Sequence, residues 1–124
     1  MPETTGCSCG GDVKLIFACS GAADVGQVAD LAARRLGRSG AGKMFCITGV
    51  GGRVPGIIKS AQAAQKILAI DGCPLNCTRL ALQQAGITDF QHLQLADMGL
   101  EKGKTPPSED AVARVTAEGA KRLQ

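Results

Sequence analysis

Short apolar runs bounded by turn residues alternate with helical patterns along this chain. Three of these runs are mostly apolar from end to end, as strands buried in a parallel sheet are. A fourth run alternates apolar with polar residues, which is typical of a half-buried strand at the edge of a sheet. The predicted strands cover residues 13–18, 43–48, 66–70 and 90–96.

Helical patterns separate and follow these strands. Each predicted helix begins at a capping residue or at a proline, and two of the helices are expected to end at a glycine. The residues at which the helices start are Asp24, Pro55, Pro74 and Ser108, and the two glycines are Gly37 and Gly86.

This alternation predicts a three-layer α/β fold, with a mainly parallel four-stranded sheet and helices on both of its faces. We expect a Rossmann- or flavodoxin-like arrangement with strand order 2-1-3-4 and right-handed crossovers. A chain of 124 residues supports one domain with a substantial core. We therefore predict a flexible N-terminal tail over residues 1–11 and a single domain over residues 12–124.

Composition and charge narrow the possible partners. The chain has three Phe but neither Tyr nor Trp, which disfavours nucleic-acid proteins that stack bases on aromatic side chains. A formal net charge of +3 is too small to indicate binding to a phosphate backbone. No apolar run approaches the roughly 20 residues that span a bilayer, and the first residues lack a secretion signal. We expect a cytoplasmic protein with neither nucleic acid nor membrane as its partner.

Cysteine is the unusual component, with six in the chain. In a reducing compartment such a set indicates metal binding or redox chemistry rather than disulfides. Cys19 ends the first predicted strand, Cys46 lies near the end of the second, and Cys73 and Cys77 follow the third. Ligand sites of parallel α/β sheets form at the carboxyl ends of the strands. These four cysteines are therefore the candidate metal ligands.

The spacing of Cys73 and Cys77 is compatible with a shared ion. With Cys73 at the N-cap of the predicted third helix, the two Cβ atoms would lie roughly 5–6 Å apart, and two sulfurs each about 2.3 Å from a zinc ion fit that separation. The positive end of the helix would favour the thiolate form. Glycines flank the cysteines at positions where backbone N–H groups must approach sulfur: Gly21, Gly49, Gly51, Gly52 and Gly72.

The cysteines also have ordinary structural explanations. A free cysteine in a strand is commonly a small apolar core residue, and this applies to Cys46 taken alone. The pair in Cys7-Ser8-Cys9 is either an auxiliary thiol pair or part of a tail without a role. Four cysteines at three strand ends favour a shared site more strongly than any pair does.

Two segments, Ala18-Cys19-Ser20-Gly21 and Ile70-Asp71-Gly72-Cys73-Pro74-Leu75-Asn76-Cys77, together with Cys46, resemble the DGC-domain family, which is named for its Asp-Gly-Cys motif. The resemblance covers nearly the whole chain, and the Asp-Gly-Cys-x3-Cys element is its most specific part. It implies a small zinc-binding protein with four characteristic cysteines, which correspond here to Cys19, Cys46, Cys73 and Cys77. It implies no particular reaction.

We therefore predict a protein that holds one Zn²⁺ ion through these four cysteines. A binding module is favoured over an enzyme, because zinc sites with four cysteine ligands are usually closed and structural. Two alternatives remain open. In one, three cysteines hold the ion and Cys19 is free to react, as in a metal-handling or thiol enzyme. In the other, the protein is a redox sensor that holds no metal and forms reversible disulfides.

Three further features carry less weight. The segment Gly49-Val50-Gly51-Gly52-Arg53-Val54 has the layout of a dinucleotide fingerprint, but its third glycine position is Val54. The single histidine, His92, is far in sequence from the cysteines and is expected to be a solvent-facing strand residue. Asp71 is either an acceptor or general base beside the metal ligands, or an ordinary turn residue before glycine.

Overall fold

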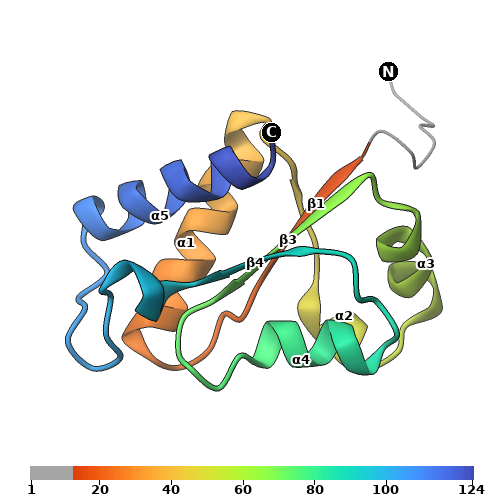
Figure 1. The fold of residues 1–124 in the computed structure, drawn as a ribbon, viewed down its shortest axis with the longest axis horizontal. Coiled ribbons are helices and arrows are strands. Elements are labelled where there is room, and N and C mark those ends of the chain that lie inside the picture. The colour runs from red at the N-terminus through yellow and green to blue at the C-terminus, as the bar shows by residue number, and fades with distance from the viewer. Residues whose placement is uncertain (1–12) are drawn as a thin grey trace.

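The computed structural model describes residues 13–124, so the predicted tail and the Cys7-Ser8-Cys9 pair lie outside the described residues. Four parallel strands form one sheet in the order β2-β1-β3-β4 (Figure 1). This confirms the predicted parallel sheet and its strand order. The strands are β1 (Lys14–Ala18), β2 (Lys43–Met44), β3 (Lys66–Asp71) and β4 (Gln91–Gln94).

Helices cover both faces of the sheet and give the three predicted layers (Figure 1). The first and last helices pack together on one face, and the other three lie on the opposite face. Within residues 13–124, no helix is both long and apolar enough to cross a bilayer. The helices are α1 (Asp24–Ser39), α2 (Ile47–Gly51), α3 (Pro55–Ala63), α4 (Cys77–Gln84) and α5 (Glu109–Arg122), and a 3₁₀ turn, η2 (Leu95–Met98), follows β4.

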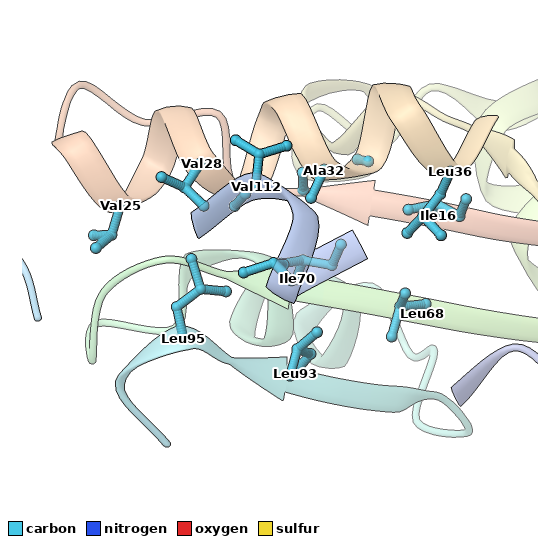
Figure 2. Packing of buried hydrophobic residues seen from close by; sticks show 14 of the residues in the cluster. Ile16, Val25, Val28, Ala32, Leu36, Leu68, Ile70, Leu93, Leu95 and Val112 are labelled. Atoms are coloured by element: carbon cyan, nitrogen blue, oxygen red, sulfur yellow. The ribbon is translucent and has the colours of Figure 1, made fainter. Parts of the chain in front are cut away.

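The larger part of the core lies between α1, α5 and the sheet. Figure 2 shows one apolar stripe of α1 directed at the strands, with residues three or four positions apart, as a helix buried on one side requires. Each large aliphatic side chain buried here contributes about 1.5–3 kcal/mol relative to its exposed state. The buried residues of the stripe and of the strands beneath it are Val25, Val28, Ala32, Leu36, Ile16, Leu68 and Ile70.

Two predicted helix starts are confirmed. Pro55 occupies the first turn of α3, where its missing N–H costs nothing. The Ser108 side chain accepts a hydrogen bond from the N–H of Ala111 at 3.2 Å and so caps α5.

The bounds predicted for α1 were wrong at both ends. Asp24 lies in the first turn rather than at the cap, and its carboxylate accepts the backbone N–H groups of Gly103 and Thr105, which anchors the loop before α5. These bonds hold the pKa of Asp24 below its ordinary value. The helix passes Gly37 and ends at Ser39, and its C-cap is Gly40, whose φ of 85° suits glycine.

The second predicted strand is much shorter than expected. After β2, Phe45 donates one more backbone bond to the carbonyl oxygen of Ile16 at 2.8 Å, and the chain then turns into α2. Cys46 is the N-cap of this helix, and its Sγ accepts the N–H of Gly49 at 3.3 Å. A residue expected to end a strand therefore begins a helix.

The outer strand β4 is also shorter than predicted, because the chain enters η2 at Leu95. Among residues 13–124, no strand pairs with the outer edge of β4. Arg122, in the last turn of α5, donates from Nη1 to the carbonyl oxygen of His92 at 2.6 Å.

Candidate functional site

The four predicted ligands lie at the carboxyl edge of the sheet, after three adjacent strands. Cys19 directly follows β1, Cys46 follows β2, Cys73 follows β3, and Cys77 begins α4. All four are free thiols; Cys19 and Cys73 are half-buried, whereas Cys46 and Cys77 are exposed. The fold thus brings the four residues to one edge, as the strand pattern predicted.

A position at the same edge of the sheet does not by itself place the four thiols around one metal ion. Within the part of the chain that the structure describes, no group of three or more His, Cys, Asp or Glu side chains is arranged to hold a metal ion. Zinc requires its sulfur ligands about 2.3 Å from the ion. The four thiols match zinc in the chemistry of the donors but not in their described spacing, and the predicted ligand set stays a prediction.

Two of the sulfurs accept hydrogen bonds from glycine N–H groups, as the flanking glycines predicted. Gly72 donates to Sγ of Cys19 at 3.4 Å, and Gly49 donates to Sγ of Cys46 at 3.3 Å. Position 72 also requires glycine for space, because a Cβ there would lie 2.5 Å from the carbonyl carbon and oxygen of Val25. Backbone donors of this kind favour a thiolate over a thiol.

The expected start of the third helix was wrong. Pro74 lies in a turn, Cys73 is not an N-cap, and α4 begins only at Cys77. The residue before the helix, Asn76, has a left-handed backbone with φ of 56°, and its side chain makes no capping bond. The two cysteines are therefore four residues apart across a turn, not along one helical face.

The capping of α4 comes from Asp71 at the end of β3. Its carboxylate is 1% exposed and accepts the N–H of Thr78 at 2.8 Å and the N–H of Arg79 at 3.0 Å. These are two of the backbone donors that a helix start leaves unpaired. Asp71 thus serves as the capping acceptor of α4, which neither explanation from the sequence described, and a role beside the metal ligands stays a prediction.

The sequence interpretation of His92 was wrong. Its side chain is 20% exposed, and its Nε2 lies 2.9 Å from Oδ2 of Asp71. Gln94 of the same strand, for which the sequence predicted no role, donates from Nε2 to the carbonyl oxygen of Cys73 at 2.9 Å and to the side-chain oxygen of Asn76. His92 and Gln94 of β4 thus hold the segment that carries Cys73 and Cys77.

The contact between His92 and Asp71 could be predicted only from the register of β4 against β3. In the observed pairing, Ala69 lies opposite His92 and Asp71 lies opposite Gln94. Paired residues of neighbouring strands point to the same face of a sheet. The predicted strand order alone would have suggested the encounter of β4 with Asp71, but an apolar pattern does not fix how far one strand is shifted along the next.

Comparison with known proteins agrees with the family resemblance predicted from the sequence. The DGC domain matches this chain over residues 15–118. A curated relative from Pseudomonas aeruginosa strain PAO1, named anaerobic and virulence modulator AnvM, is 39% identical over 118 residues, covering 89% of this chain and 90% of the relative. No solved structure is similar enough to count as a match.

Proposed function

Because the chain belongs to the DGC domain family, we propose that it is a zinc-binding protein that holds one Zn²⁺ ion through Cys19, Cys46, Cys73 and Cys77. The observation that carries the proposal is the placement of four free thiols after three neighbouring strands of one sheet. Cysteine thiolates are the commonest ligands of closed zinc sites, and such sites are structural rather than catalytic. The protein is thus proposed as a binding module.

The surroundings of the sulfurs support this assignment. Four thiolates around one divalent ion leave a net negative charge, which needs compensation from nearby donors. The N–H groups of Gly49 and Gly72 already point at two of the sulfurs. Cys77, at the start of α4, lies beside the positive end of that helix.

Binding by all four sulfurs requires the strand-end turns to draw together. In the described conformation the thiols lie on one edge without forming a group of three. The segments that would adjust are the turn after β1 and the start of α2, which carry Cys19 and Cys46. We expect this adjustment to be local, because the sheet core beneath these turns is buried without any contribution from a metal.

Metal content tests the proposal directly. Protein prepared anaerobically should contain one zinc per chain, measured by elemental analysis together with free-thiol titration. The Cys73→Ser and Cys77→Ser variants should lose most of the metal, since each removes one thiolate ligand. A Cys7→Ser/Cys9→Ser variant is the matched control and should keep it. Loss of zinc from the control together with retention by Cys73→Ser would contradict the assigned site.

A second candidate, a thiol-based redox response, is favoured by one specific observation. The relative's name describes an anaerobic modulator, and two of the four thiols here, those of Cys46 and Cys77, are exposed. In this case two thiols would form a disulfide, releasing two protons and giving two electrons to an added oxidant such as hydrogen peroxide, which becomes water. Reversible, pairwise disulfides among the four cysteines in metal-free protein, mapped by mass spectrometry, would favour this candidate.

The reactivity of Cys19 separates a binding module from an enzyme. A Cys19 thiolate bound to zinc should alkylate slowly until a chelator is added, whereas a free Cys19 beside the ion should react quickly. The comparison needs the Cys7→Ser/Cys9→Ser background so that the remaining cysteines can be followed individually. Rapid, stoichiometric labelling of Cys19 with zinc still bound would replace the binding module by a thiol enzyme.

A further inference from the structure

The segment from Asp71 to Cys77 carries two of the four proposed ligands, and it is fixed from one side by β4. We propose that His92 and Gln94 are positioning residues for two of the four proposed ligands: together they hold this segment, and with it Cys73 and Cys77, in one conformation before a metal ion binds. The inference rests on the proposed function for the identity of the ligand. It rests on hydrogen bonds within the described residues for the positioning itself.

His92 acts through Asp71. The Asp71 carboxylate is buried and already accepts two backbone N–H groups of α4, from Thr78 and Arg79. Because Oδ2 is an acceptor in its bond with Arg79, the hydrogen in the pair with His92 belongs to Nε2 of the ring. His92 therefore orients the carboxylate that fixes the first turn of α4, and Cys77 is the first residue of that turn.

Gln94 acts on the other end of the segment. The residue is 9% exposed, and both polar atoms of its side chain have partners. Nε2 donates to the carbonyl oxygen of Cys73 and to the side chain of Asn76, while Oε1 accepts the N–H of Ala96 at 3.1 Å. The amide thus bridges β4 and the turn, and it holds Asn76 in the left-handed conformation that connects the two cysteines.

The register of the sheet makes this arrangement possible. Gln94 lies opposite Asp71 and reaches forward to the turn, whereas His92 lies opposite Ala69, two residues earlier, and reaches up to the carboxylate. The two side chains are therefore placed on the same face of β4 and reach successive parts of the segment. Within the described residues, the sulfur of Cys46 accepts its hydrogen bond from Gly49, outside this segment, whereas the sulfur of Cys19 accepts one from Gly72, inside it. Cys46 is therefore the cysteine that the effect should not reach.

The test compares individual cysteines within one protein. The full chain with Cys7→Ser/Cys9→Ser is kept metal-free by chelator, and the alkylation rate of each remaining cysteine is followed by mass spectrometry. The paired variants are His92→Asn and His92→Gln: both carry an amide, but only the glutamine amide reaches the position of Nε2. Gln94→Met removes the second contact independently. Gln91→Met is the matched control, because Gln91 is exposed on the same strand.

We expect His92→Asn and Gln94→Met to speed the alkylation of Cys73 and Cys77, with Cys46 unchanged as the internal reference. His92→Gln should restore the original rates, which loss of packing alone would not predict. Zn²⁺ affinity, measured by competition with a chromophoric chelator, should fall about tenfold or more in the first two variants, as it does when groups that orient metal ligands are removed.

Several results would overturn the positioning role. These are unchanged rates at Cys73 and Cys77 in folded variants, equal acceleration at Cys46, the same effect in Gln91→Met, or no restoration by His92→Gln. If His92→Asn fails to fold, Gln94→Met and the His92→Gln comparison still decide the question. If the unmodified protein binds no Zn²⁺, the proposed function fails, while the metal-free alkylation rates continue to test the positioning.

Discussion

Replacing Gly72, the glycine of the Asp-Gly-Cys motif, by alanine should strongly destabilise the protein. A Cβ at this position would lie 2.5 Å from the carbonyl carbon and oxygen of Val25 and 2.7 Å from the nitrogen of Gly26. All three atoms belong to the backbone in the first turn of α1, so no side-chain rotation relieves the contact. The turn after β3 and the start of α1 approach each other as closely as two backbones can.

The magnitude follows from the distance that must be recovered. An ordinary contact of roughly 3.5 Å requires the two backbones to separate by about 1 Å. The start of α1 would have to move with Val25 and Val28, both fully buried against the sheet. Inserting a methyl group into a packed interior costs about 1–3 kcal/mol, and the backbone contact places Gly72→Ala at the upper end, about 3 kcal/mol. Domains have about 5–15 kcal/mol of stability, so the variant should still fold.

Urea denaturation followed by circular dichroism measures this change, and the thermal midpoint should fall by roughly 12 °C or more. The matched control is Gly56→Ala in α3, where a Cβ meets no atom within 4 Å. Alanine at this position should raise the free energy of unfolding by about 0.5–1 kcal/mol. A Gly72→Ala protein within about 0.5 kcal/mol of the original, a change typical of surface substitutions, would refute the close-packing argument.

Three further predictions concern local contacts and the metal. Ser108→Ala should cost about 1 kcal/mol in urea denaturation, because the bond from the N–H of Ala111 is lost; Ser108→Asn should retain most of it. The pKa of Asp24 is held below its ordinary value by the N–H groups of Gly103 and Thr105. The contribution of this carboxylate to the stability of the folded protein is therefore complete above the ordinary carboxyl pKa, and it is lost as the pH falls through the lowered pKa. Amide exchange in the loop before α5 should therefore accelerate in acid, and Asp24→Asn should remove that pH dependence. Chelation should leave the amide spectrum of the sheet intact, unlike zinc fingers, which unfold without metal; loss of the whole pattern would contradict this.

The predictable part of the fold is the part that depends on apolar periodicity. Strands β1 and β3 lie where continuous apolar runs placed them, and the strand order follows from general rules for parallel α/β sheets. The same strand pattern predicts that Cys19, Cys46, Cys73 and Cys77 lie at the carboxyl edge of the sheet. Neither result needed knowledge of any particular side-chain contact.

The errors occurred where a contact from a distant residue decides the local structure. Pro74 has a strong preference for a helix start, yet α4 begins later because Asp71 supplies its capping bonds from the end of β3. The early end of β2 is an exception, because it comes with a local contact: the sulfur of Cys46 accepts the N–H of Gly49, three residues on, and caps α2. His92 was placed in solvent because the shift of β4 along β3, which brings it to Asp71, is not encoded in an alternating pattern.

The bond between Arg122 and the carbonyl oxygen of His92 has a consequence for the behaviour of this protein in concentrated solution. An edge strand with unpaired polar groups can recruit a strand from another molecule and so start sheet-to-sheet association. Here the guanidinium of Arg122, in the last turn of α5, donates a hydrogen bond to a backbone carbonyl oxygen of that edge strand. The C-terminal helix thus has a second use beyond covering the core: it discourages the outermost strand from being extended by a neighbouring copy.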